Sequence, residues 1–292
     1  MRFPDGFVWG TATAAHQVEG GNWNNDWWMW EHDPASPCQE PSGDACDSFH
    51  RWPDDVQLCA DLGFTAYRFS LEWSRIEPEE GEFSRAALEH YRRMCMACRE
   101  RGLEPIVTFH HFTTPRWVVA RGGWAEPATA ERFARFSARA AAHLGDVLGR
   151  VCTLNEPNIV ATMGYLYGLF PPGQRDPALR LRANDVMIAA HRKAVEAIHG
   201  GPGRAPVGLT LAMSDFQPVP GGEAACDAYR RDMEDVFLEA ARGDDFLGVQ
   251  CYSRRASDRT ASSAPRTACV SRRCATSSGP RRSRRRSAGR RR

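Results

Sequence analysis

The residues best suited to chemistry are Asn155 and Glu156, which end the apolar run at 150–156. A carboxyl group at the end of a buried strand can be held partly out of water, and burial raises its pKa toward the range of a general acid. Such a glutamate can equally be structural or balance a helix dipole. The residues at the ends of the other apolar runs decide between these interpretations.

Polar and aromatic residues also gather at the ends of the other apolar runs. They are His16, Gln17 and Glu19 after the first run, Arg68, Glu72 and Trp73 along and after the second, His110 and His111 in the third, and Tyr252 in the last. In a parallel β/α barrel the carboxyl ends of the strands carry the active site. The distribution therefore favours a barrel whose chemistry lies at one end.

Apolar runs and amphipathic runs alternate strictly along the first 252 residues. We predict strands at 7–16, 66–73, 105–112, 150–156, 205–214 and 245–252, and helices at 53–63, 84–102, 127–145, 184–201 and 224–243. This alternation indicates a parallel sheet covered by helices. An open doubly wound sheet usually has a glycine-rich phosphate loop after its first strand, and no G-x-G-x-x-G occurs there. We therefore predict an α/β fold, a (β/α)8 TIM barrel that is incomplete, with about six of its eight units.

The chain is acidic up to residue 252 and strongly basic after it. Residues 253–292 hold 14 arginines against one acid, Asp258, so the formal net charge of +2 divides into +13 for this tail and −11 for the body. The tail also has no aromatic residue and one branched aliphatic residue, Val270. Such a segment cannot offset its ordering entropy by burial, so we expect a barrel at 1–252 and a disordered Arg/Ser-rich tail at 253–292.

Two origins of the tail stay open. A shifted reading frame in GC-rich DNA produces this composition and is the interpretation we favour. A basic arm that binds nucleic acid through phosphate contacts is the alternative. Because no aromatic side chain is present to stack on bases, nucleic acid is the less favoured partner.

The sequence also indicates the cellular compartment of the protein and the oxidation state of its cysteines. No run of about 18 apolar residues occurs, which argues against a membrane-spanning helix. The N-terminus lacks the basic and apolar regions of a secretory signal, so we expect a cytoplasmic protein. In that compartment the ten cysteines, including the Cys95 and Cys98 pair, are expected to be reduced thiols in packed positions.

Five segments in order resemble the strand-end motifs of glycoside hydrolase family 1, the β-glucosidase/β-glycosidase family. They are FVWGTATAAHQVEG, AYRFSLEWSRIEP, TFHHFTTPRW, TLNEPN and DFLGVQCYSR. The resemblance covers residues 3 to about 254. It corresponds to the N-terminal part of the family fold, and the Arg-rich tail is unrelated to it.

The resemblance implies a role for six residues. Glu156 would be the acid/base, while Arg68 and Tyr252 would orient the nucleophilic carboxylate and keep it ionised. The sugar would be bound by Gln17, by His111 and by Asn155, whose contact with the 2-hydroxyl strengthens in the transition state. His110 stands where the family usually has an aromatic residue, and Gln250-Cys251-Tyr252 replaces the usual Asn-Tyr-Tyr.

The resemblance also implies a second carboxylate, which this sequence lacks. The family nucleophile lies in a Thr-Glu-Asn-Gly motif on the seventh strand, and no such motif occurs here. We therefore expect a retaining β-glycosidase of small β-glycosides or oligosaccharides by descent, with little or no turnover by this truncated chain. The alternatives are a non-catalytic sugar-binding remnant and a nucleic-acid-binding module that uses the tail. No metal ion and no cofactor are expected, and the sequence does not indicate an oligomeric state.

Overall fold

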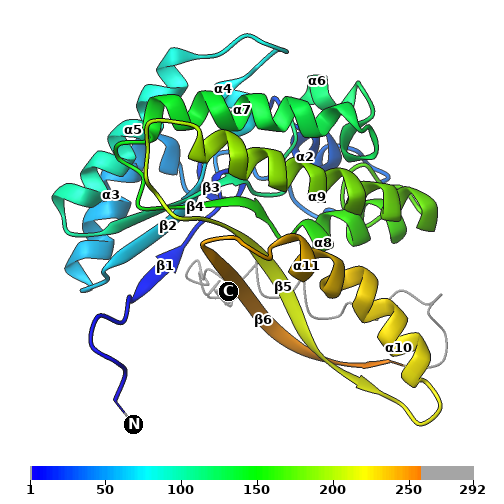
Figure 1. The fold of residues 1–292 in the computed structure, drawn as a ribbon. Coiled ribbons are helices and arrows are strands. Elements are labelled where there is room, and N and C mark those ends of the chain that lie inside the picture. Colours follow the sequence, from blue (N-terminus) through cyan, green and yellow to red (C-terminus); the bar gives the residue numbers. More distant parts are fainter. Residues whose placement is uncertain (1, 258–292) are drawn as a thin grey trace, which may run out of the picture.

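A single sheet of six parallel strands forms the centre of the protein. The structure is a computed structural model that describes residues 2–257. The strands are hydrogen-bonded in the order of the sequence, and the sheet curls into part of a barrel (Figure 1). Their bounds are β1 Gly10–Ala12, β2 Ala66–Ser70, β3 Glu104–His110, β4 Arg150–Asn155, β5 Val207–Pro218 and β6 Phe246–Ser257. The predicted alternation is confirmed.

Helices follow each of the first five strands and cover the outer face of the sheet. The longer ones are α3 Ser48–Asp61, α5 Arg85–Glu100, α7 Ala128–Leu144, α9 Pro177–His199 and α10 Glu223–Arg230. The shorter ones are α1 Ala15–Val18, α2 Asp26–Glu31, α4 Trp73–Ile76, α6 Arg116–Val119, η1 Gly123–Ala125, α8 Pro157–Ala161, η2 Thr162–Leu166, η3 Arg231–Asp235 and α11 Val236–Ala240. Neighbouring long helices contact one another in the order α3, α5, α7 and α9 (Figure 1). Within the described residues, no helix is long and apolar enough to cross a membrane.

Helix α5 shows how the sequence produces these elements. The Ser84 side chain accepts a hydrogen bond from the backbone nitrogen of Ala87 and so caps the first turn. Leu88, Tyr91 and Cys95 recur at helical spacing and are buried against the sheet. Gly102, with φ +73°, ends the helix in a conformation that a side chain would disfavour.

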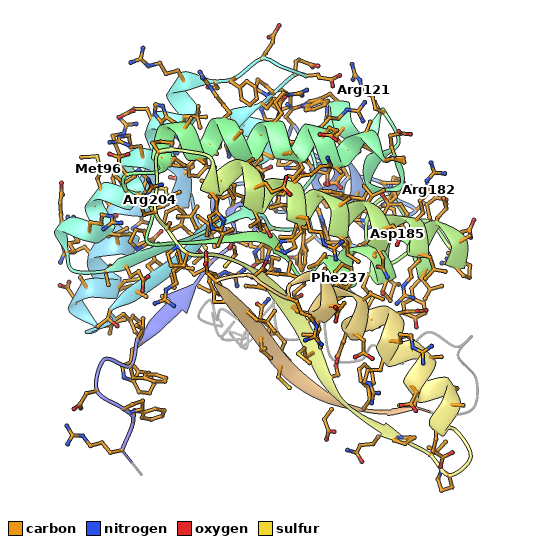
Figure 2. The ribbon with its side chains drawn as sticks, viewed as in Figure 1. Met96, Arg121, Arg182, Asp185, Arg204 and Phe237 are labelled. Carbon is orange, nitrogen blue, oxygen red and sulfur yellow. The ribbon has the colours of Figure 1, made fainter. Side chains whose placement is uncertain are left out.

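The core lies between the helices and the outer face of the sheet. Figure 2 shows side chains filling this layer, with Met96 of α5 at the outer surface. Aromatic rings contact one another in this layer: the Trp73 ring lies 5.5 Å from Phe133 and 5.2 Å from Phe136, and Phe109 lies 6.1 Å from Phe136. These buried rings hold α4 and α7 against β3. The packed core therefore supports the loops that follow the strands.

The first predicted strand, 7–16, is much shorter than expected. After Ala12 the backbone nitrogen of Thr13 donates to the Arg68 carbonyl, and that of Ala15 donates to Ser70 Oγ at 2.7 Å. The chain thereby leaves the sheet and enters α1, which carries Gln17. The hydroxyl of Ser70, on the neighbouring strand β2, thus ends β1. The hydropathy pattern of residues 7–16 does not reveal this contact.

The last predicted helix and strand also differ from expectation. The run 224–243 divides into α10, the wider π-helical turn η3 and α11, and η3 carries Glu234, which accepts a hydrogen bond from the Ser214 backbone. Strand β6 continues to Ser257, past the boundary expected at residue 252. The rest of the predicted tail, with its expected disorder and the alternative nucleic-acid arm, lies outside the described residues.

Candidate active site

Arg68 links five strands across the inside of the curled sheet. From β2 its Nε donates to Thr108 Oγ1 on β3 at 2.9 Å, and its Nη2 donates to Asn155 Oδ1 on β4 at 2.7 Å. The same guanidinium donates to Thr210 Oγ1 on β5 at 3.2 Å and to Gln250 Oε1 on β6 at 3.4 Å. These contacts show that the sheet is curved enough for β2 and β6 to meet through their side chains.

Asn155 is the second centre of this network. Its Oδ1 also accepts a hydrogen bond from Gln250 Nε2 at 2.9 Å, and its Nδ2 lies 3.3 Å from His111 Nε2. Burial, with the positive charge of Arg68 and the neighbouring His110, lowers the pKa of His111 to about 3. His111 is therefore neutral, and its Nε2 can accept the hydrogen bond from the Asn155 amide.

Glu156 follows Asn155 in the left-handed region, with φ 48° and ψ 54°. Its backbone nitrogen donates to the Thr210 carbonyl at 2.8 Å, which fixes the turn out of β4. Burial raises the pKa of the carboxyl to about 7, and the Arg68 charge opposes this rise. A carboxyl with this pKa can hold a proton near neutral pH and donate it, as a general acid requires.

The predicted site residues are only partly brought together. Arg68, His111 and Asn155 form one network with Glu156 beside it, and the Tyr252 hydroxyl donates to Gln250 Oε1 at 3.4 Å from a side chain that is 80% exposed. Gln17 is exposed on α1. Within residues 2–257 its side chain makes no hydrogen bond, so the structure does not join it to the network.

The network contains residues that sequence reasoning did not assign to the site. They are Thr108, Thr210 and Gln250, all of which bind Arg68. Thr108 and Thr210 each stand between two apolar neighbours in a strand, a signal that could have identified them. His110, by contrast, packs 5.0 Å from the Trp124 ring and belongs to the core.

An aromatic wall borders the network. Phe112, at φ 72°, places its ring 4.8 Å from His111 and 5.7 Å from Phe170. Phe170 in turn lies 4.8 Å from Trp27, one of the four tryptophans of the 22–32 segment. Aromatic rings beside polar side chains can contact the apolar faces of a ligand.

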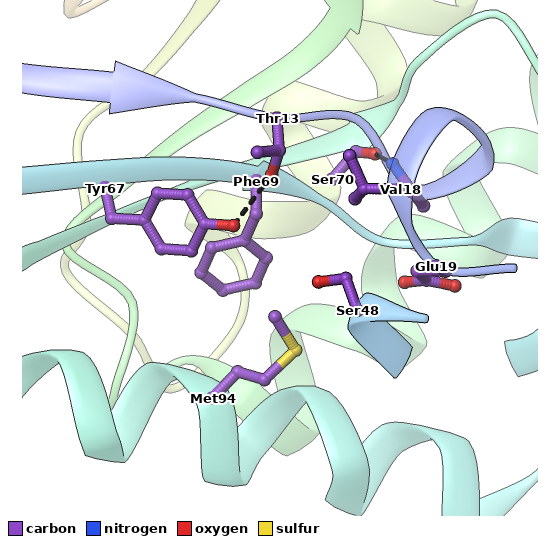
Figure 3. Close-up of a pocket in the computed structure, with 9 residues that line it drawn as sticks. Thr13, Val18, Glu19, Ser48, Tyr67, Phe69, Ser70 and Met94 are labelled. Carbon is purple, nitrogen blue, oxygen red and sulfur yellow. Dashed lines mark hydrogen bonds between the residues drawn. The ribbon is translucent and has the colours of Figure 1, made fainter. Parts of the chain in front are cut away.

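Two pockets lie away from the network. A cavity of about 10 Å³, lined by Thr13, Tyr67 and Ser48 among others, has room for about one water molecule (Figure 3). A larger cavity of about 300 Å³ lies between the loops after β3 and β4, lined by Asp26, Trp124 and Tyr165 among others. Neither is lined by the residues that bind Arg68.

The hydrogen bonds of Arg68 go to uncharged side chains. Within the part of the chain that the structure describes it forms no ion pair, and all four of its hydrogen-bond acceptors are neutral oxygens. The same residues contain no group of three His, Cys, Asp or Glu side chains that could hold a metal ion. Among the described residues, the site thus combines one protonatable carboxyl, Glu156, with one positive charge that forms no ion pair, Arg68.

Comparison with known proteins identifies the family. The model of glycosyl hydrolase family 1 matches residues 1–241. Beta-glucosidase A of Thermotoga maritima is 36% identical over 265 residues, covering 82% of this chain and 59% of that protein. The beta-glucosidase of an Agrobacterium species is 36% identical over 237 residues, covering 79% of this chain and 52% of that protein. The chain therefore spans less than two thirds of the length of these curated relatives.

Solved structures agree with this assignment. The crystal structure of beta-glycosidase BGL167 matches with a TM-score of 0.82 and 46% identity, over 93% of this chain and 71% of that one. The family 1 beta-glucosidase of Thermotoga maritima in complex with isofagomine lactam matches with a TM-score of 0.81 and 29% identity, over 87% of this chain and 67% of that one. The predicted incomplete TIM barrel is confirmed, and the chain belongs to glycosyl hydrolase family 1.

Proposed function

We propose that this site binds a small β-glycoside and that Glu156 protonates the leaving oxygen of the glycosidic bond. The observation that supports this most is the Glu156 carboxyl, whose pKa of about 7 lets it carry a proton beside the network of Arg68 and Asn155. The names of the relatives, which are beta-glucosidases, indicate the class of substrate. Gln17, His111 and Asn155 are the proposed sugar ligands, with Arg68 and Tyr252 as positioning residues.

The described residues supply only part of what hydrolysis by this mechanism needs. A retaining glycosidase needs two carboxyl groups about 5–5.5 Å apart, one as acid and one as nucleophile. Arg68, which would face the nucleophile, has no carboxylate partner among the described residues. We therefore propose that unaided hydrolysis is slow, because a missing nucleophile typically costs several orders of magnitude in rate.

Azide tests this proposal directly. With an aryl β-glucoside, azide would form a bond to the anomeric carbon as the carbon–oxygen bond breaks, and Glu156 would give its proton to the departing phenolate. The expected products are a glycosyl azide and a phenol, formed by the full-length chain only when azide is present. Glu156→Gln should abolish the release, while the exposed Glu40→Gln serves as the matched control.

Other outcomes would decide against the proposal. Rapid hydrolysis without azide would show that a nucleophile is present after all. Calorimetric binding of gluconolactone with no azide-dependent release would favour the non-catalytic sugar-binding alternative. If the chain showed neither gluconolactone binding nor azide-dependent release, the proposal that it binds glycosides would be wrong. A cytoplasmic location stays a prediction.

A further inference from the structure

A pocket of about 300 Å³ lies between the loops that follow β3 and β4, apart from the Arg68 network. Helices α2 and α6 and the start of α9 border it, on the right side of the molecule in Figure 1. Its floor consists of buried side chains and its rim of exposed ones, so a ligand can enter it from solvent. The floor includes Asp26, Thr114, Trp124 and Tyr165, and the rim includes Pro172 and Gln174.

Most of the pocket wall is apolar. Val119 of α6, Val160 of α8 and Leu179 of α9 supply aliphatic surface, and Trp124 supplies aromatic surface. The indole nitrogen of Trp124 is already used, because it donates to Thr114 Oγ1 at 3.1 Å. Apolar walls with a small number of polar groups are typical of sites for small organic molecules.

One carboxyl group, that of Asp26, lies in the floor, and this residue is only 8% exposed. Its Oδ1 accepts hydrogen bonds from the backbone nitrogens of Trp27 and Thr114, at 2.9 and 2.8 Å. Among residues 2–257, its Oδ2 has neither a hydrogen bond nor an ion pair. A ligand in the pocket would therefore find one free acceptor on a buried carboxyl.

The charges described around Asp26 are mainly negative. Burial raises the pKa of its carboxyl to about 7, its two backbone hydrogen bonds oppose this rise, and the Glu72 carboxyl adds to it. Within the described residues, Glu72 accepts hydrogen bonds from neutral groups only. His16, whose positive charge would lower the Asp26 pKa, lies 3.3 Å from Glu31 and is hydrogen-bonded to it. No described residue that lines the pocket is lysine, arginine or histidine.

A ligand with a positive charge would remove this imbalance. An ionised carboxyl without a partner is costly inside a protein, and an ammonium group next to Oδ2 would offset that cost. The Trp124 and Tyr165 side chains line the same pocket, and aromatic rings also attract cations. An organic ammonium ion combines this charge with an apolar body that matches the wall.

Other ligands match the pocket less well. Calcium and magnesium ions need about six or more oxygen ligands, whereas the described residues contain no group of three His, Cys, Asp or Glu side chains that could hold a metal. An anion would be repelled by Asp26 and by Glu72. A neutral alcohol could donate to Oδ2 but would leave the carboxylate charge unbalanced.

We propose that this pocket, with Asp26 in its floor and Trp124 and Tyr165 in its wall, binds a small primary amine in its ammonium form. The ammonium group donates to Asp26 Oδ2, and the apolar body of the ligand contacts Val119 and Val160. The site is separate from the Arg68 network, so this inference does not depend on the proposed function.

Isothermal titration calorimetry on the full chain tests this site. The probes are isobutylamine, cyclohexylamine and phenethylamine, and the matched neutral ligands are isobutanol, cyclohexanol and phenethyl alcohol. We expect at least one amine to bind one-to-one, and its alcohol to bind at least about tenfold more weakly because it forms no ion pair. Equal affinities of amine and alcohol, or binding by none of the amines, would overturn the proposal.

Asp26→Asn removes the charge and keeps an oxygen that can accept from the backbone nitrogens of Trp27 and Thr114. It should weaken amine binding at least about tenfold. Asp33→Asn is the matched control, because Asp33 is exposed and its Oδ1 also accepts a backbone hydrogen bond, from Ala35. Equal losses in the two variants, or no loss in Asp26→Asn, would contradict the assignment of the site.

Glu156→Gln separates this site from the proposed active site, whose carboxyl could also attract an amine. Amine binding should be unchanged in this variant, whether or not the chain releases phenol with azide. Loss of amine binding in Glu156→Gln, with Asp26→Asn unaffected, would place the amine beside Glu156 and overturn the inference.

The pH dependence of binding tests the site in the parent chain. Only ionised Asp26 can pair with the ammonium group, so the apparent Kd should fall about tenfold between about pH 6 and about pH 8. Since Glu72, His16 and Tyr165 also lie near Asp26, the Asp26→Asn variant identifies the group, and it should show little such fall. A Kd of the parent chain that does not change with pH would count against the ion pair.

Val119→Phe covers the case in which Asp26→Asn fails to fold. The larger side chain narrows the pocket at a half-buried position without changing any charge, so it should weaken amine binding severalfold. Leu58→Phe is its control, since Leu58 is 57% exposed on α3. Melting temperatures confirm that both variants are folded, and equal affinities of the two folded variants would show that the amine binds elsewhere.

Discussion

Arg68 Nη2 donates to Asn155 Oδ1 at 2.7 Å, which joins β2 to β4 across the inside of the sheet. Because Asn155 is also the residue before Glu156, this contact connects the positive charge of the site to the backbone of the proposed acid. The pair therefore matters both for the stability of the open sheet and for the position of the carboxyl.

Asn155→Ala should destabilise the protein by about 1–3 kcal/mol, because it leaves donors of Arg68 and Gln250 without their acceptor. Urea unfolding followed by circular dichroism measures this change. Gln57→Ala, which breaks an exposed side-chain pair with Asp61, should change stability by less than about 0.5 kcal/mol. Similar losses in the two variants would show that the interior network contributes no more than a surface contact.

Azide-dependent release of phenol should decline as pH rises through the pKa of Glu156, about 7. Only the protonated carboxyl can donate to the leaving oxygen, so the rate should fall about tenfold for each further unit of pH. Initial rates between about pH 6 and pH 9 measure this profile. A second substrate whose phenol leaves without protonation should show a much flatter profile, and an identical profile for both would contradict the acid role.

Asp26 should make the protein less stable at higher pH. Burial raises its pKa from 3.8 to about 7, so the native state holds the proton more tightly than the unfolded chain does. The stabilisation is fully present below about 4 and is lost as the pH rises through about 7. Melting temperatures across this window measure the loss.

Asp26→Asn is the matched variant for that experiment. The amide keeps an oxygen that can accept from the backbone nitrogens of Trp27 and Thr114, as Asp26 Oδ1 does at 2.9 and 2.8 Å. The variant should show a smaller fall in melting temperature than the parent chain. An unchanged slope would mean that other groups, such as the buried Glu19, account for the pH dependence.

The cysteines should differ sharply in reactivity in the native state. Cys46 and Cys251 are exposed, whereas burial raises the pKa of Cys98 to about 12 and also that of Cys95. Brief alkylation followed by peptide mapping should modify Cys46 and Cys251 first, and Cys95 and Cys98 only after unfolding. Early modification of the Cys95–Cys98 pair would point to a redox role that the buried helix does not suggest.

The sequence predicted the larger features because each has a local physical signal. Alternation of apolar and amphipathic runs predicted the sheet and its helices, and the Asn155–Glu156 pair predicted a partly buried carboxyl with a raised pKa at the end of β4. The boundaries of β1 were wrong because they depend on hydrogen bonds that the Arg68 carbonyl and the Ser70 hydroxyl accept, and both residues are distant in the chain. The Arg68 network was also only partly predictable, because Gln250 reaches it only once the sheet has curved.

Glu156 occupies a left-handed backbone conformation, which costs an ordinary side chain of the order of 1 kcal/mol. Glycine adopts the same conformation without that penalty. Glu156→Gly should therefore have a higher melting temperature than the parent chain while losing its proposed proton donor. At position 156, thermal stability and the proposed proton donation therefore favour different residues.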